Sequence, residues 1–286
     1  MTNSFSASVF ACGLILLTSV QLTHAAATTN ITASAGLMLD DNITRAQYQR
    51  DIYDDRAVFA GVIADYSLSI SDRSRAQFTA NAESWHYQQS NLDHHLFSLQ
   101  ADYILQPVAG YTAPWYILSL TYGISGYDDE YRDANFNELG LVVGKRLTDA
   151  TIMRIGISRQ TSSADSEIFS LTSTRLYGNL DFRLDQNTLY TTLAYNTGDI
   201  TSTNTPPHPP SLSSVPWIDD DDAFPGLNNT WTYKLDADTW SLRLGYVYAI
   251  NSMQSFDASV LYYSSSAYGG NDYDGIISSI TYFYRF

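Results

Sequence analysis

The stretch GIISSITYFYRF, residues Gly275 to Phe286, carries the pattern that decides the fold. Nearly every second position in it is apolar or aromatic. These positions are Ile276, Ile280, Tyr282, Tyr284 and Phe286. A period of two predicts a β-strand with one apolar face. Because chain ends in water are usually polar and frayed, an aromatic stripe here predicts a strand buried against apolar surroundings.

The same alternation recurs along the chain. Apolar residues occupy the odd positions from Ala33 to Leu39 and the even positions from Val58 to Ile70, opposite mainly small or polar residues. Each such segment is long enough to cross hydrocarbon as a tilted strand, which takes about 9 to 11 residues. The pattern predicts twelve strands, at about 29–40, 56–70, 75–88, 95–106, 114–126, 136–147, 152–162, 169–183, 188–198, 238–250, 255–266 and 275–286.

Short and long connections alternate between these strands. SDRS (71–74), LTDA (147–150) and LDQN (184–187) are short, whereas 41–55 and 199–237 are long. This rhythm is typical of an up-and-down barrel with turns at one end and loops at the other. A soluble β-sandwich also alternates, but it does not usually keep strands this long or sort its loops by length. We therefore predict an all-β fold, a transmembrane antiparallel up-and-down β-barrel of about 12 strands.

The first residues indicate export. Val9–Val20 is a short apolar run, and Gln21–Ala27 offers small residues for cleavage, as in a secretory signal peptide. The run is too short for a spanning helix, which needs about 20 apolar residues. The predicted organisation is a signal peptide at 1–27 and an outer-membrane β-barrel at 28–286. Because Cys12 is the only cysteine, the mature chain has no disulfide, thiol nucleophile or thiolate metal site.

Composition agrees with a barrel and excludes binding to nucleic acid. Charged residues make up 16% of the chain, against about 25% in typical domains. Hydrophobic residues make up 44% of the chain, but they do not form a long apolar run. They are instead spread over strands in which apolar and polar residues alternate. The net charge of -15 has the wrong sign for contacts with phosphates. No cofactor and no metal site is predicted.

The final strand resembles the C-terminal strand of bacterial outer-membrane β-barrels. In that class, a terminal Phe preceded by alternating apolar and aromatic residues is read by the barrel assembly machinery. The resemblance implies that Phe286, Tyr284, Tyr282 and Ile280 face lipid and form the assembly signal. It also implies residence in the outer membrane of a Gram-negative bacterium. The implied partners are outer-membrane lipid, lipopolysaccharide and the assembly machinery.

A second, shorter resemblance lies at GLMLDDNITRAQ, Gly36 to Gln47. This segment is similar to the opening of the barrel domain in surface lipoprotein assembly modifier proteins. The helical repeat domain that precedes the barrel there has no room in this chain, so the resemblance implies a barrel and not lipoprotein export.

Seven charged residues face the lumen if the apolar positions face lipid. They are Asp65, Glu83, Asp102 and Glu138 on the second to sixth predicted strands, and Arg154, Arg175 and Arg243 on the seventh, eighth and tenth. Acids thus line one wall and arginines the other. In general porins, such separation sets a transverse field across a water-filled constriction, and charged rings tune which ions pass. The pattern favours a porin-like passive channel for small polar solutes or ions.

The alternative is a plugged lumen in which these charges pair. Asp181 near Arg154 and Asp257 near Arg243 are the candidate pairs. A plugged barrel would not conduct and would serve adhesion, envelope structure or the assembly of surface proteins.

An outer-membrane hydrolase is the third interpretation. His94 and His95 follow Asp93 in a predicted outer loop, where an acid–base pair is conceivable. His86 falls on the lipid-facing side of its strand, but no serine of an adjacent strand is placed as its partner. Because no catalytic motif is visible, we predict two solvated loop histidines at His94 and His95, an interfacial polar residue at His86, and no enzyme.

The longest predicted loop, 199–237, lies outside the membrane and has a character of its own. It contains six of the eight prolines of the chain, which cannot donate to a strand ladder. Asp219–Asp222 lacks the spacing of a known calcium loop and predicts a solvated acidic tip. The neighbouring NNTWTYKL, 228–235, is expected to form a hairpin that folds over or into the mouth of the barrel.

Overall fold

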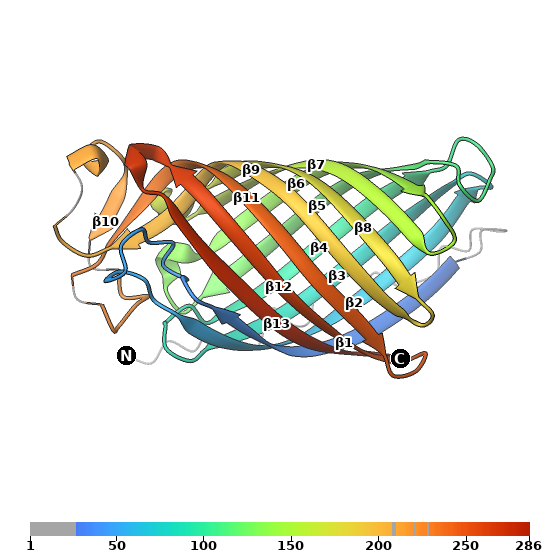
Figure 1. The fold of residues 1–286 in the computed structure, drawn as a ribbon, viewed down its shortest axis with the longest axis horizontal. Helices are drawn as coiled ribbons and strands as arrows, with labels where there is room; N and C mark the ends of the chain where they lie inside the picture. Colours follow the sequence, from blue (N-terminus) through green and yellow to red (C-terminus); the bar gives the residue numbers. More distant parts are fainter. Residues whose placement is uncertain (1–26, 208–209, 220, 228) are drawn as a thin grey trace.

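The computed structural model describes residues 27–207, 210–219, 221–227 and 229–286. It is a closed antiparallel barrel, in which each strand pairs with its neighbours in sequence order (Figure 1). The barrel strands are β1 (Ala27–Asp40), β2 (Asp55–Ser71), β3 (Ser74–Tyr87), β4 (His94–Leu105), β5 (Trp115–Tyr127), β6 (Ala134–Arg146), β7 (Thr151–Ala164), β8 (Thr172–Leu184), β9 (Asn187–Asn204), β11 (Trp231–Ala249), β12 (Gln254–Ala267) and β13 (Tyr273–Arg285). A short β10 (Trp217–Asp219) adds to the edge of β11. The short 3-10 helices are η1 (Glu130–Arg132), η2 (Glu167–Phe169), η3 (Pro210–Leu212) and η4 (Tyr268–Gly270).

Two pairings close the barrel. The last strand lies beside the first, with Ile280 opposite Leu37. β9 and β11 are separated by a long connection but pair directly with each other, with Arg243 opposite Thr192. Every barrel strand therefore has two partners and no edge is left open, which is the arrangement that satisfies backbone hydrogen bonds in hydrocarbon.

The strands alternate between an outward apolar face and an inward polar face. On β5, Leu118 and Leu120 are 51% and 58% exposed on the outside, whereas Ser119 and Thr121, which follow them, point inward. The same outward exposure recurs on neighbouring strands at Val62, Leu99 and Leu141 among others. An apolar belt that encircles the barrel fits hydrocarbon and not water. No helix among the described residues is long and apolar enough to cross a membrane.

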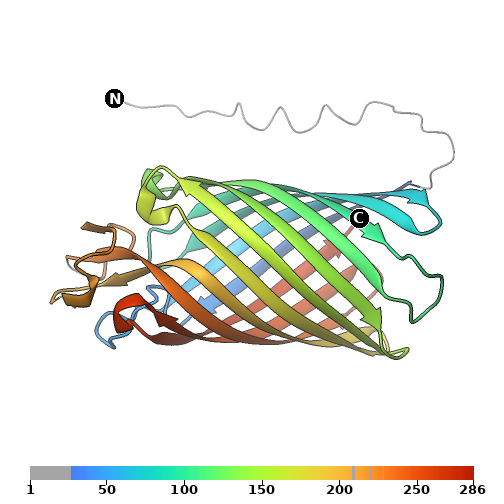
Figure 2. The ribbon, with the colours of Figure 1, turned by 90° about the horizontal axis from the view of Figure 1, so that it is seen from above.

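The two ends of the barrel differ. One end has the short connections, such as 72–73 and 185–186, together with Ala27 and the C-terminus. We call it the turn end. The other has the connections 41–54, 88–93, 128–133, 165–171, 205–230 and 268–272, and we call it the loop end (Figure 2).

The predicted fold class and the twelve barrel strands are confirmed. The long loop predicted at 199–237 is shorter than expected at both ends, because β9 continues to Asn204 and β11 begins at Trp231. The irregular connection is therefore 205–230. The predicted signal peptide lies outside the described residues except for Ala27, which begins β1.

A barrel with paired backbone groups throughout should resist mild detergent. We expect the folded protein to migrate faster than the boiled protein on a gel run in dodecyl sulfate, because the closed ladder stays compact until heated. Gel mobility before and after boiling measures this. Identical migration of the two samples would argue against the closed barrel.

Candidate functional site

The strand register places all seven predicted charged residues on the inward face. Each is followed or preceded by an outward apolar residue, as Leu139 follows Glu138 and Leu242 precedes Arg243. The acids lie on β2, β3, β4 and β6, and the arginines lie on β7, β8 and β11. The two kinds of charge thus occupy different sectors of the lumen wall.

Neutral donors, not arginines, hold three of the four acids. Asp65 accepts a hydrogen bond from Thr79 Oγ1 at 2.7 Å. Glu83 accepts from Asn81 Nδ2 at 3.0 Å and from Trp85 Nε1 at 2.9 Å. Asp102 accepts from Gln100 Nε2 at 2.9 Å. These bonds orient the carboxylates along the wall without neutralising them.

Arg154 is the exception among the seven charges. It forms an ion pair with Asp181 and donates to Asn179 Oδ1 at 2.9 Å, so the predicted Arg154–Asp181 contact is present. Arg175 lies over the ring of Tyr177, 5.2 Å from its centre. Among the described residues, no ion pair forms to Asp65, Glu83, Asp102, Glu138, Arg175 or Arg243. The predicted neighbours Arg243 and Asp257 are close enough for their charges to interact but form no direct ion pair; Asp257 accepts hydrogen bonds from Tyr190 Oη at 2.9 and 3.1 Å.

Large inward side chains lie flat against the wall. Tyr190 covers Gly245 and Tyr177 covers Gly156, and an added Cβ would lie 2.2 and 2.5 Å from those rings. Glycine at these positions lets each ring lie along the neighbouring strand, where a Cβ would push it toward the axis. These two rings therefore lie along the wall of the lumen.

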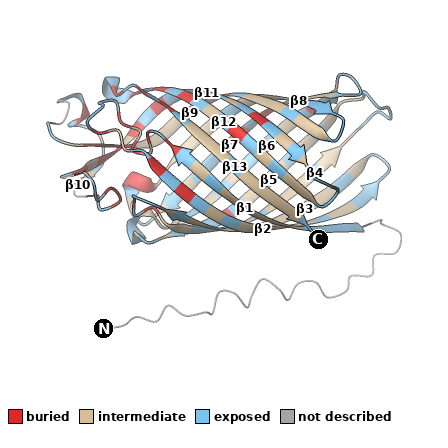
Figure 3. Ribbon diagram, turned by 60° about the horizontal axis from the view of Figure 1, so that its bottom comes forward, coloured by how far each residue is buried: buried red, intermediate tan, exposed pale blue. Residues whose placement is uncertain are grey.

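No apolar core fills the middle of the lumen in the described part of the chain. The buried hydrophobic residues gather at the loop end, and the small Ala194 is the only one deep in the barrel (Figure 3). Unpaired charges in a dry interior would cost several kcal/mol each, on the order of the desolvation penalty of a buried ion. The six charges without an ion pair among the described residues therefore favour a hydrated lumen over a dry one.

The loop end is covered by a segment that we call the tongue, residues 200–235. It consists of the ends of β9 and β11 and the connection between them (Figure 1). Both of its faces are covered. Tyr233 and Leu235 pack with Leu212 and Ala267, and on the other face Thr203 and Thr232 share a hydrogen bond of 2.7 Å between their hydroxyls.

The 41–54 loop holds the tongue from one side. The amide of Thr203 donates to the carbonyl of Thr44 at 2.9 Å, and Ser202 Oγ donates to the carbonyl of Arg45 at 2.8 Å. The amide of Thr205 donates to Asp51 Oδ1 at 3.1 Å, and the carboxyl of Asp51 is fully buried. These contacts join β1 and β2 to β9 across the mouth.

Asp221 holds the tongue from the other side. Its carboxylate, 2% exposed, forms an ion pair with Arg132 and accepts from the hydroxyl of Thr232. The predicted solvated acidic tip is therefore wrong for Asp221, whereas Asp219 and Asp222 are exposed. Among the described residues, no group of three or more His, Cys, Asp or Glu side chains is placed to hold a metal ion.

An apolar cluster completes the cover. Leu92, Ala223 and Phe224 are buried together, with Ile43, Tyr53, Tyr87 and Leu227 packed around them. These residues come from the 41–54 loop, β3, the 88–93 loop and the tongue. The cluster fixes the tongue over the lumen.

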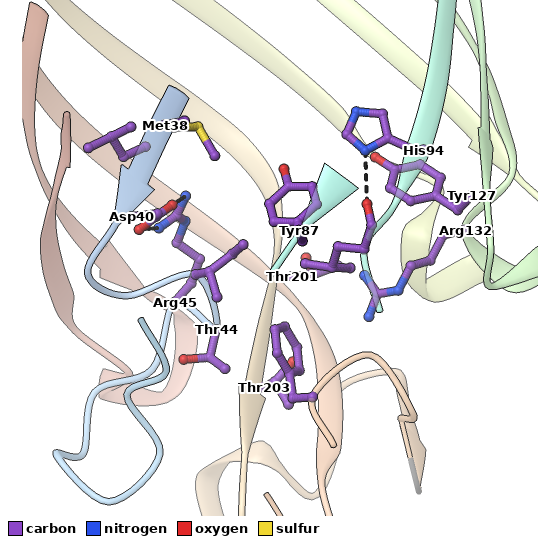
Figure 4. Close-up of a pocket in the computed structure, with 14 residues that line it drawn as sticks. Met38, Asp40, Thr44, Arg45, Tyr87, His94, Tyr127, Arg132, Thr201 and Thr203 are labelled. Carbon is purple, nitrogen blue, oxygen red and sulfur yellow. Dashed lines mark hydrogen bonds and ion pairs between the residues drawn. The ribbon is translucent and has the colours of Figure 1, made fainter. Parts of the chain in front are cut away.

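Beneath this cover remains a cavity of about 350 Å³ (Figure 4). Its lining comes from nearly all sides of the barrel: Met38, Asp40, Ile43, Thr44, Arg45, Tyr87, Leu92, His94, Tyr127, Arg132, Thr201, Thr203, Phe224 and Ile277. The sequence analysis identified only His94 of these residues, because the others are brought together by loops distant in sequence.

The histidines do not form the suggested acid–base pair. Asp93 pairs with His86 Nδ1 on the outward face, and not with His94 or His95. His94 points into the cavity, where its Nδ1 lies 2.9 Å from the carbonyl of Leu92. It is therefore part of the mouth and not a solvated loop residue.

Comparisons with known proteins show the fold. No protein-family model and no curated protein matches the chain. Among solved structures, an outer membrane channel from Pseudomonas putida F1 matches with a TM-score of 0.54 and 10% identity, over 92% of this chain and 98% of that chain. A KdgM porin matches with a TM-score of 0.42 and 10% identity, over 88% of this chain and 98% of that chain. The first likeness shows that the chain shares the barrel fold of that channel.

Proposed function

We propose that this protein is a passive channel for small polar solutes or ions in the outer membrane of a Gram-negative bacterium. The observation that carries the proposal is the set of six inward charges without ion pairs among the described residues. Inward charges without ion pairs destabilise a barrel unless water solvates them, so they are not expected in a barrel with a purely structural role. Water around them makes a path for solutes.

The arrangement of charge supports a channel with an ionic preference. Asp65, Glu83 and Asp102 lie on one sector, and Arg175 and Arg243 lie on another. Opposed sectors create a transverse field that orders permeating ions. The whole chain carries a net charge of -15, so cations are concentrated near it. The channel thus prefers cations.

The covered mouth supports a second candidate, a barrel that does not conduct. The tongue is held by the buried carboxylates of Asp51 and Asp221 on opposite sides of the mouth. A permanently closed mouth would leave a structural or adhesive barrel that presents its loops to the surroundings. Conductance decides between the two candidates.

Removing the two unpaired arginines should raise conductance. In Arg175→Ala with Arg243→Ala, bulk and positive charge leave the lumen, so both single-channel conductance and cation preference should increase. The measurements are single-channel current in a planar bilayer and reversal potential in a salt gradient. Arg159→Ala is the matched control, since Arg159 lies two residues beyond the outward-facing Ile157 on β7 and outside the lumen.

If neither the wild-type protein nor the double variant conducts, in barrels that pass the gel-mobility test, the proposed channel function would be contradicted. That outcome would support the barrel that does not conduct. A control variant that changes conductance as much as the double variant would show that the effect does not come from the lumen.

A further inference from the structure

We propose that the cavity beneath the tongue binds a neutral, hydroxylated ring compound of the size of a mono- or disaccharide. The inference rests on the proposed channel function, because the cavity lies where the lumen meets its mouth. Its lining includes Met38 and Ile277 on the β1 and β13 side, Tyr127 on β5, and Thr201 on β9 (Figure 4). A solute that crosses the mouth passes through this space.

One wall of the cavity is aromatic. The ring of His94 stacks on Tyr127, with centres 4.7 Å apart, and lies 6.0 Å from the ring of Tyr87. Trp85 stacks on the far side of His94 at 5.9 Å and 8°. The rings stack on one another in a row, so the ring edges that line the cavity form a rigid surface at low entropic cost. A ring compound can lay one face against this surface.

The same wall has polar atoms that make no hydrogen bond among the described residues. Among the described residues, no hydrogen bond forms to the hydroxyl of Tyr87 or of Tyr127. The carbonyl of Leu92 accepts from His94 Nδ1, so in the neutral ring Nε2 is left as an acceptor. A hydrocarbon would desolvate these atoms without satisfying them, which costs free energy. A ligand with several hydroxyls supplies both donors and acceptors.

Both arginines of the lining are already paired with carboxylates. Arg45 forms an ion pair with Asp40 at 2.7 Å, and Arg132 pairs with Asp129 and Asp221. Burial lowers the pKa of Arg45, but the hydrogen bond and the charge of Asp40 outweigh it and raise the pKa, so the guanidinium stays charged and paired. An anionic ligand would compete with these carboxylates. The described lining therefore leaves no unpaired arginine for an anionic ligand, which favours a neutral one.

The volume fits one or two sugar rings. A cavity of about 350 Å³ is at the lower end of the range of about 300 to 1,000 Å³ in which small ligands bind. The lining also has apolar side chains, Met38, Ile43 and Ile277, which fit the C–H face of such a ring.

The test is a binding titration with the full-length folded protein in detergent, by calorimetry, with maltose, phenol and benzoate as separate probes. We expect saturable binding of maltose and weaker binding of phenol and benzoate. Tyr87→Phe and Tyr127→Phe should each weaken maltose binding about fivefold, the value of one hydrogen bond of about 1 kcal/mol. Tyr103→Phe, on the outward face of β4, should bind as the wild type does.

Tighter binding of phenol or benzoate than of maltose would overturn the ligand class. Equal binding by the wild type and both cavity variants, or an absence of saturation with maltose, would overturn the site. Single-channel current on the same preparation separates the two proposals. A conducting protein that does not bind maltose refutes only the site, and a maltose-binding protein that never conducts refutes only the channel.

Discussion

Replacing residues 200–235 with an Asn-Gly turn should raise single-channel conductance several-fold while the barrel stays assembled. Asp199 and Asp236 are direct partners in the β9–β11 ladder, so a two-residue turn can join them. The change removes the tongue with its carboxylate Asp221 and the buried Phe224. The wall of the lumen below keeps its pairing, because the β9–β11 ladder continues to Thr188 opposite Val247.

The matched control shortens a connection at the other end. Replacing residues 106–114, between β4 and β5, with the same Asn-Gly turn alters the turn end and leaves the mouth unchanged. Conductance of this control should equal that of the wild type. Equal conductance of the barrels with and without the tongue would show that the tongue does not limit passage.

Deleting Phe286 should lower the amount of assembled protein strongly without lowering synthesis. The amide of Phe286 donates to the carbonyl of Ile31 at 3.0 Å, so this residue extends the seam between β13 and β1. Its ring is 74% exposed on the outside and lies 4.9 Å from the ring of Tyr284. An exposed aromatic at the end of the closing strand is available to the assembly machinery, as the resemblance to outer-membrane barrels implies.

Pulse labelling, followed by the gel-mobility test on the membrane fraction, separates synthesis from assembly. Phe182→Ala is the control, since Phe182 is also an exposed aromatic at the turn end but lies on β8, away from the seam. A chain that ends at Arg285 and reaches normal assembled levels would contradict the assigned role of the final residue.

The barrel could be predicted because its signal is local. The alternation of apolar and polar residues within each strand indicates which face is outward, as Leu118 and Leu120 do on β5. The inward parity of the charges followed from the same rule. The pair Arg154–Asp181 was also predictable, because β7 and β8 are neighbouring strands and both residues lie near the turn end, where Ile152 is opposite Asp181.

The mouth could be predicted only in part. A hairpin within the long connection was expected, and Trp231, Tyr233 and Leu235 show the alternation of a strand. The pairing of this strand with the end of β9 was not predicted, because the neighbouring prolines favour a loop. The burial of Asp221 had no local signal at all, since its partner Arg132 is 89 residues away. Contacts of this kind depend on which loops meet above the lumen.

A cysteine placed in the lumen tests the central claim, a hydrated interior covered at the loop end, most directly. Thr121 faces the lumen between Gln100 and Glu138, and the sequence has no cysteine except Cys12. In liposomes of known orientation, Thr121→Cys should react quickly with a charged thiol reagent added at the turn end and slowly with reagent added at the loop end. The lipid-facing Leu120→Cys should not react from either end. Failure of Thr121→Cys to react from both ends, in barrels that pass the gel-mobility test, would show a dry lumen and contradict this account.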